Sequence, residues 1–176
     1  LFGLVACSDK KESVNNYEGT FTSEKGGTLI DAMSGEPSNL ISMIAGDSAS
    51  SAISGNIFNK LIKYDKNLEL APELASRWII SNDQKTITFY LKKNLKWADG
   101  YDLTSDDVLF TWKLVTDEKT RTPYGSDYKL VDKAEALDPY TFRVNYKKAY
   151  APALDSWASL QILPKHILKD EDINHT

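Results

Sequence analysis

Histidine and cysteine are nearly absent from this sequence, which has two histidines and one cysteine among 176 residues. One thiol cannot form an internal disulfide, and no second histidine or cysteine stands at the spacing that a zinc site needs. No serine combines a strand–turn–helix context with a partner histidine, and no phosphate-loop motif follows Gly26 and Gly27. The sequence therefore predicts no catalytic site, no metal site and no cofactor, and we do not expect an enzyme.

Long apolar runs and an excess of positive charge are also missing. No run reaches the roughly 18 residues that a membrane-spanning helix needs. The 21 basic and 25 acidic residues give a net charge of −4, which argues against nucleic acid as a partner. Hydrophobic residues make up 41% and charged residues 26% of the chain, and both values are typical of a globular protein. Binding is the remaining class of function.

The first residues contain a lipobox, Leu4-Val5-Ala6-Cys7, in which a small residue precedes the cysteine. We interpret residues 1–7 as the remnant of a signal peptide and Cys7 as the lipidation site. Residues 8–26 are rich in Ser, Asn, Lys, Glu and Gly and predict a flexible tether. The lipid bilayer would then be a partner through Cys7, at the periplasmic or extracellular face of the cell envelope. The alternative is a free cysteine packed in a small apolar plug.

A strand, a turn and a capped helix follow one another between residues 70 and 114. Residues 86–91 alternate between apolar and polar, which predicts a strand with one buried face. Gly100 supplies a positive φ for a tight turn, and Thr104 can cap the helix that follows. The adjacent carboxylates Asp106 and Asp107 point about 100° apart on a helix, so we interpret them as cap and solvent contacts rather than an acid pair. The apolar stripe of this helix consists of Val108, Leu109, Trp112 and Val115.

The remaining elements are predicted from apolar periodicity and turn residues. We expect strands at 27–33 and 160–163, a hairpin of 131–137 with 140–146, and helices at 49–63 and 151–159. We also expect a loop at 41–48, an extended arm at 64–70 and a helical turn at 71–76.

The segment from 70 to 114 resembles the family signature of bacterial extracellular solute-binding proteins of the peptide-binding kind. The matching positions are Pro72, Glu73, Leu74, Ala75, Trp78, Phe89, Leu91, Trp97, Asp99, Gly100, Thr104, Asp107, Val108 and Trp112. The departures are small: the family commonly has Arg at the position of Lys92 or Lys93, and Ser or His at that of Ala98.

This resemblance implies an α/β fold of the periplasmic-binding-protein-like type II kind. It would be an incomplete first lobe with a peripheral mixed β-sheet subdomain. We expect residues 27–47 to start lobe I, residues 48–149 to form the peripheral subdomain, and residues 150–176 to return into lobe I. Because the family has two lobes around a hinge, the sequence resembles a chain truncated before lobe II.

The resemblance also implies a function and a binding site. The protein would be the substrate-binding subunit of an ABC importer, a monomer that captures oligopeptides and delivers them to permease subunits. The alternatives are a receptor for a nickel chelate or an oligosaccharide, and a sensing or adhesion lipoprotein that is not coupled to transport. The ligand-binding residues would be Gly46, Asp47, Ser48, Ala49 and Tyr124. Asp47 has the alternative role of a helix cap, and Tyr124 that of a loop aromatic held by Pro123.

Overall fold

The computed structural model describes residues 27–28, 30–33 and 35–175. The described residues divide into two units, one with residues 27–28 and 30–32 and the other with residues 33 and 35–175. Cys7 and the tether at 8–26 lie outside the described residues. The strand predicted at 27–33 is wrong, because its described residues have no regular structure. A strand needs a hydrogen-bonded partner, and no described segment pairs with this one.

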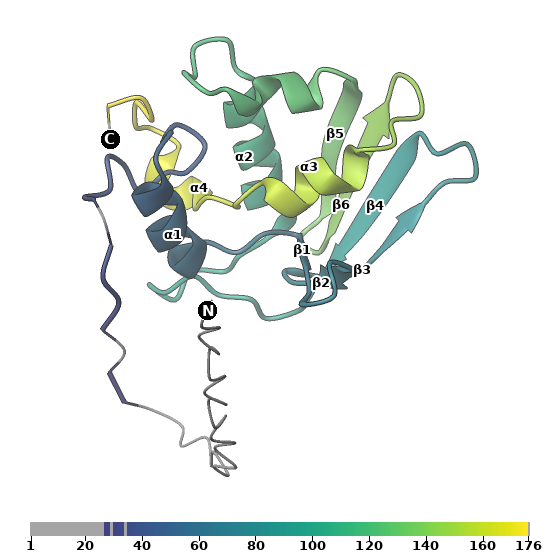
Figure 1. The fold of residues 1–176 in the computed structure, drawn as a ribbon. Helices are drawn as coiled ribbons and strands as arrows, with labels where there is room; N and C mark the ends of the chain where they lie inside the picture. Colours follow the sequence, from purple (N-terminus) through teal and green to yellow (C-terminus); the bar gives the residue numbers. More distant parts are fainter. Residues whose placement is uncertain (1–26, 29, 34, 176) are drawn as a thin grey trace, which may run out of the picture. The chain divides into compact units, whose positions relative to one another are not determined.

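A four-stranded antiparallel sheet is the main feature of the second unit (Figure 1). Its strands, in spatial order, are β3 (Ala75–Ile80), β4 (Thr86–Leu91), β6 (Thr141–Tyr146) and β5 (Val131–Asp138). The predicted strand at 86–91 and the predicted hairpin are confirmed. The expected sheet was mixed, whereas every pairing observed here is antiparallel. Short turns join β3 to β4 and β5 to β6, and parallel neighbours need long crossover connections instead.

Two helices cover one face of this sheet. Helix α2 (Ser105–Thr116) packs on β5 and β6. Helix α3 (Ala153–Ser159) inserts the fully buried Trp157 between Phe89 of β4 and Phe142 of β6, with ring centroids 5.9 and 5.2 Å away. The alternation predicted for β4 and β6 is thereby explained, since their apolar side chains point towards these helices.

The turn and cap before α2 are confirmed in detail. Gly100 has φ +92°, in the left-handed region that favours glycine. The Thr104 hydroxyl accepts from the backbone N–H of Asp106, and the Asp107 carboxylate accepts from the backbone N–H of Thr104 in a capping box. Local chemistry therefore determines where this helix begins.

The helix predicted at 49–63 is wrong in its second half. Helix α1 (Ser48–Ile57) ends at Ile57, and a hairpin of β1 (Ile62–Tyr64) with β2 (Leu70–Pro72) follows. Lys60 pairs with Gln161 in an isolated bridge. Pairing with distant segments, rather than helical packing, buries the apolar residues that continued the helical spacing.

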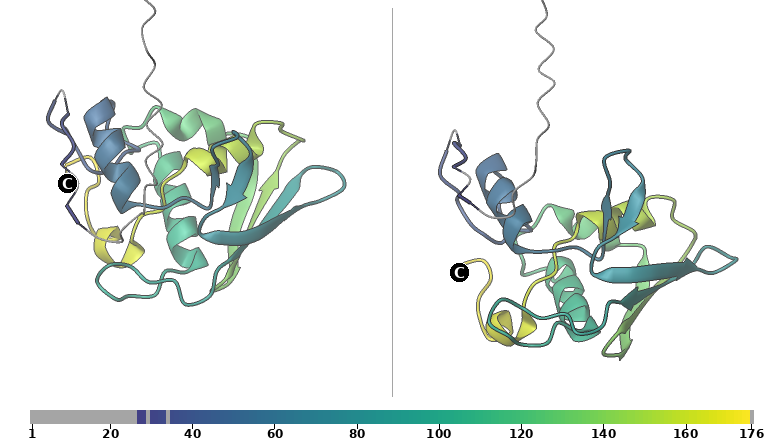
Figure 2. Two further views of the ribbon diagram at one scale, coloured as in Figure 1. Left: turned by 60° about the horizontal axis from the view of Figure 1, so that its bottom comes forward. Right: turned by 90° about the horizontal axis from the view of Figure 1, so that it is seen from below.

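Two further elements differ from the sequence-based expectation. The helical turn predicted at 71–76 is wrong, because those residues form the end of β2 and the start of β3. The strand predicted at 160–163 is reduced to the bridge at Gln161. A short 3-10 helix, η1 (Tyr124–Tyr128), and a four-residue helix, α4 (Lys165–Leu168), complete the unit. Figures 1 and 2 show α1 on the side of α2 that faces away from the sheet.

Candidate functional site

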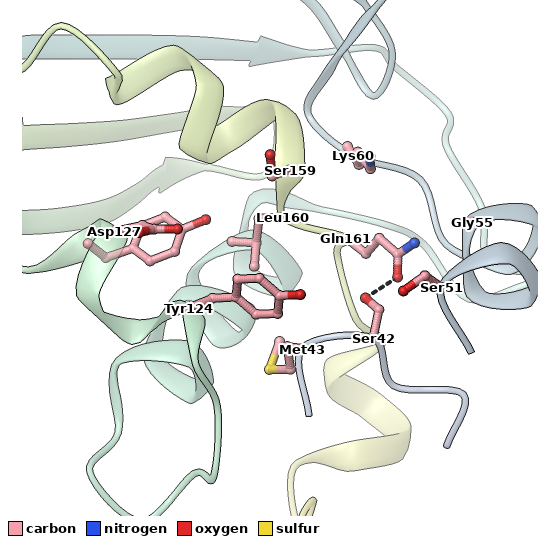
Figure 3. A pocket seen from close by; sticks show the side chains of 11 residues that line it. Ser42, Met43, Ser51, Gly55, Lys60, Tyr124, Asp127, Ser159, Leu160 and Gln161 are labelled. Carbon is pink, nitrogen blue, oxygen red and sulfur yellow. Dashed lines mark hydrogen bonds between the residues drawn. The ribbon is translucent and has the colours of Figure 1, made fainter. Parts of the chain in front are cut away.

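A pocket of about 370 Å³ lies between α1, η1 and the segment that follows α3 (Figure 3). Its volume is at the small end of the range for ligand sites, roughly 300–1,000 Å³. The pocket is lined by Ser42, Met43, Ser51, Gly55, Lys60, Tyr124, Asp127, Tyr128, Ser159, Leu160 and Gln161. Its wall therefore combines apolar surface, two tyrosines, several neutral hydrogen-bonding groups and two charged residues, Lys60 and Asp127.

Tyr124 is the predicted site residue that lines this pocket. Its ring points into the pocket between Met43 and Leu160 (Figure 3), and the side chain is 44% exposed. Pro123 is the N-cap of η1. A Cβ on Gly125 would meet the Val115 carbonyl at 3.0 Å, so the absence of a side chain there lets η1 lie close against the end of α2. Both neighbours of Tyr124 thus help to set the position of its ring.

Ser42 and Gln161 join two walls of the pocket although they are far apart in sequence. The Ser42 hydroxyl donates to the Gln161 Oε1 atom. Because the Gln161 carbonyl oxygen accepts this bond, its amide nitrogen remains as a donor. Gln161 is 7% exposed and lines the pocket. A largely buried amide donor beside an open pocket is suited to a carbonyl group of a ligand.

The predicted site residues at 46–49 lie elsewhere, at the start of α1. None of Gly46, Asp47, Ser48 and Ala49 lines the pocket. The Asp47 carboxylate accepts hydrogen bonds from the Ser50 backbone N–H at 2.7 Å and from the Ser50 and Ser38 hydroxyls at 2.7 and 2.5 Å.

These bonds from Ser38 and Ser50 hold the pKa of the Asp47 carboxyl far below its usual range. The geometry is that of the helix cap, the alternative that the sequence left open for Asp47. A ligand contact at 46–49 remains a prediction. One and two turns further along α1, Ser51 and Gly55 do reach the pocket.

Most of the pocket was not found from the sequence. Ser42 lies in a segment predicted as a plain loop, and Gln161 in one predicted as an apolar strand. Neither position carries a local signal, because each becomes part of a site only when the other is brought to it. Lys60 was assigned to a helix, whereas here it follows α1 in extended backbone.

His166 forms a contact at the surface of the protein. It lies in α4, its Nε2 atom is 2.7 Å from Asp99 Oδ2, and its ring stacks on Tyr101 with centroids 4.3 Å apart. The hydrogen bond with His166 lowers the pKa of the Asp99 carboxyl. This contact ties α4 to the turn before α2 and lies outside the pocket lining.

Neither a metal cluster nor a membrane-spanning helix is found in the part of the chain that the structure describes. Within residues 27–28, 30–33 and 35–175, no three His, Cys, Asp or Glu side chains gather so that they could hold an ion. No helix in those residues is both long enough and apolar enough to cross a bilayer.

Comparison with known proteins places the chain in a family. The model for the middle region of bacterial extracellular solute-binding proteins, family 5, matches residues 69–176. The oligopeptide-binding protein AppA of Bacillus subtilis (strain 168) is 33% identical over 170 residues, which is 94% of this chain and 31% of AppA. The structure of AppA in complex with a nonapeptide has a TM-score of 0.73 at 29% identity, over 80% of this chain and 28% of AppA.

Two further solved structures share the fold. The ABC transporter substrate-binding protein CtaP from Listeria monocytogenes has a TM-score of 0.80 at 30% identity, over 87% of this chain and 32% of CtaP. NikZ from Campylobacter jejuni, solved in complex with Ni(L-His), has a TM-score of 0.65 at 30% identity, over 68% of this chain and 24% of NikZ.

The chain spans less than a third of the length of each of these relatives. The expected type II periplasmic-binding-protein fold is confirmed for the part that it covers. Since the family model matches more than half of the residues, this chain belongs to family 5 of the bacterial extracellular solute-binding proteins.

Proposed function

We propose that this chain is part of the substrate-binding subunit of an ABC importer that captures oligopeptides outside the cytoplasmic membrane and delivers them to the permease. The observation that carries the proposal is the pocket beside Tyr124, in a chain of this family. AppA, which is 33% identical, is an oligopeptide-binding protein. The nickel complex of NikZ is the reason to keep a metal chelate as the second candidate.

The chemistry of the pocket supports a peptide. A peptide main chain presents carbonyl and N–H groups at regular intervals, and it binds where neutral donors and acceptors meet it. Ser42, Ser51 and Gln161 supply such groups, while Tyr124 and Leu160 supply apolar area. Aromatic side chains add large contact areas at low entropic cost. These groups would contact the main chain, which all peptides share.

The proposal includes the organisation of the whole protein. Residues 27–47 would start lobe I, residues 48–149 would form its peripheral subdomain, and residues 150–176 would return into lobe I, with lobe II beyond them. Cys7 would carry the lipid that holds a monomeric receptor on the membrane through the tether at 8–26. The Leu4-Val5-Ala6-Cys7 sequence supports this localisation.

The function is tested at Tyr124. In the intact protein, Tyr124→Ala is expected to weaken binding of a tripeptide-to-pentapeptide pool about tenfold, because the ring that lies along the ligand is lost. Tyr124→Phe keeps the ring and should stay within about threefold of the unmodified protein. Isothermal titration calorimetry gives the affinities, and thermal unfolding should be nearly unchanged since Tyr124 is 44% exposed. Recovery of only a nickel chelate or an oligosaccharide from the purified protein would overturn the peptide assignment.

Gly55 gives a second prediction, in which stability and binding change in opposite directions. Gly55 lies inside α1, and a Cβ there would meet only Gln161 Nε2, at 4.0 Å. Gly55→Ala should therefore raise the free energy of unfolding by about 0.5–1 kcal/mol through helix propensity. The same methyl group would lie in the pocket wall beside the Gln161 amide, in space that a ligand could occupy, and should weaken peptide binding several-fold. Denaturant titration and calorimetry on the same sample measure both effects, and unchanged peptide affinity would show that the ligand does not reach this wall.

A further inference from the structure

Two opposite charges face the pocket from different elements. Asp127 belongs to η1, and Lys60 lies between α1 and β1. They are the only lining residues with a full charge near neutral pH. The lining tyrosines do not add to them, because a phenol is neutral near pH 7 and burial raises the pKa of Tyr128.

Neither charge is neutralised within the described part of the protein. The Asp127 carboxylate accepts one long hydrogen bond, 3.4 Å from the Ser126 hydroxyl. It forms no ion pair with any described residue. The hydrogen bonds of Lys60 involve its backbone. Its side-chain amino group has no acceptor among the described residues. A charge that has a protein partner is already compensated, whereas these two remain available to a ligand.

The arrangement separates the charges by neutral groups. Figure 3 shows Asp127 and Lys60 on either side of the Tyr124 ring. In this view Leu160 also lies between them, whereas Ser42 and Gln161 lie on the Lys60 side of the pocket. A ligand that spans this space meets the carboxylate near one end, the ammonium and the neutral hydrogen-bonding groups near the other, and the Tyr124 ring and Leu160 in the middle.

We propose that Asp127 and Lys60 are specificity residues that select a ligand segment carrying both an ammonium group and a carboxylate. Asp127 receives the ammonium and Lys60 the carboxylate. The termini of a short peptide supply both groups, and so do basic and acidic side chains within a longer one. This inference rests on the proposed function and adds the charge pattern of the substrate to it.

The test compares peptides that differ only in their charges, on the intact protein by calorimetry. One set is trialanine with free ends, with an N-terminal acetyl group, with a C-terminal amide, and with both caps. A doubly capped Lys-Ala-Glu peptide carries the same charges on side chains instead. We expect the doubly capped trialanine to bind at least about fivefold more weakly than a peptide with both charges. This difference in affinity should decrease at high salt.

The variants assign each charge to one residue. Asp127→Asn should remove the preference for an ammonium group and leave that for a carboxylate, and Lys60→Gln should do the reverse. Asp132→Asn and Lys63→Gln change the net charge equally at exposed positions outside the pocket lining, so they should leave both preferences intact. If the affinity gained from charges is equal for trialanine with free ends and for capped Lys-Ala-Glu, the site accepts charges from termini and from side chains alike. If only one of these peptides binds more tightly than the doubly capped trialanine, that peptide identifies the source of the charges.

The failures can be told apart. If the unmodified protein binds none of these peptides, the proposed function is wrong and the charge selection is wrong with it. If it binds all of them with equal affinity, the proposed function stands and the charge selection is overturned. Equal losses for charged and capped peptides in Asp127→Asn would also overturn it, because they would show a structural effect on η1.

Discussion

Replacing Trp157 by alanine is expected to lower the free energy of unfolding by about 3–5 kcal/mol, the largest effect of any single change considered for this chain. Trp157 is fully buried, and its ring contacts those of Phe89, Phe142 and Tyr128. Truncation removes this apolar area from the core and leaves a cavity between α3 and the sheet. Denaturant titration of the intact protein, followed by circular dichroism, measures the loss.

Trp157→Phe separates packing from hydrogen bonding. The indole Nε1 atom donates to the Tyr146 hydroxyl at 2.8 Å, and phenylalanine keeps most of the ring but not this donor. Burial raises the pKa of Tyr146 to about 12, so its phenol stays neutral and would lose a partner. We expect a loss of about 1–2 kcal/mol, and a similar loss for both Trp157 variants would contradict the packing argument.

Asp107→Ala is expected to cost about 3 kcal/mol, although the residue resembles an ordinary surface acid in the sequence. Asp107 is 4% exposed and accepts from the backbone N–H groups of Thr104 at 2.8 Å and Lys165 at 3.0 Å. Alanine leaves both donors without this acceptor, and an unsatisfied buried donor costs about 1–3 kcal/mol. The bond from Thr104 is also the capping-box contact at the start of α2, so its loss is part of this cost.

Asp107 variants should also weaken ligand binding from a distance. The segment after α3 carries Leu160 and Gln161 into the pocket. It is held to α2 by Asp107 and by the Thr111 hydroxyl, which accepts from the Leu163 backbone N–H at 2.9 Å. We therefore expect peptide affinity to fall several-fold in Asp107→Ala. Calorimetry well below the melting temperature checks this expectation.

Two related variants control for this effect. Asp106→Ala lies beside Asp107 on α2, but it is exposed, with a 3.5 Å ion pair to Lys165. It should change stability by less than about 1 kcal/mol and leave affinity unchanged. Thr111→Val keeps the side-chain shape but removes the acceptor for Leu163 N–H, and should resemble Asp107→Ala in both measurements. An Asp107→Ala protein that binds peptides normally would show that the segment after α3 is positioned by other contacts.

The sequence predicted those elements whose signals are local. The strand at 86–91 follows from its own alternation, the start of α2 from the cap at Thr104, and the hairpin of β5 and β6 from the turn between two alternating segments. Each of these signals lies within a few residues of the feature that it determines. The sequence-based interpretation therefore succeeded there without information about the rest of the chain.

The same method failed where distant segments decide the conformation. The apolar spacing around Leu61 and Ile62 fits a helix as well as a buried extended segment, and both side chains are fully buried here. The bridge of Lys60 with Gln161 and the pairing of β1 with β2 select the extended form. Periodicity reports that a side chain will be buried, but not which segment will bury it.

The sequence by itself determined the family, the capped helix, the strands of the main hairpin and the ring of Tyr124 as a candidate ligand contact. Tertiary structure alone decided the pocket, because its walls come from Ser42 and Gln161, which are 119 positions apart. It also decided that Asp47 caps α1 instead of lining that pocket. The physical reason is that caps and turns are satisfied by neighbours along the chain, whereas a concave surface exists only after separate segments have packed together.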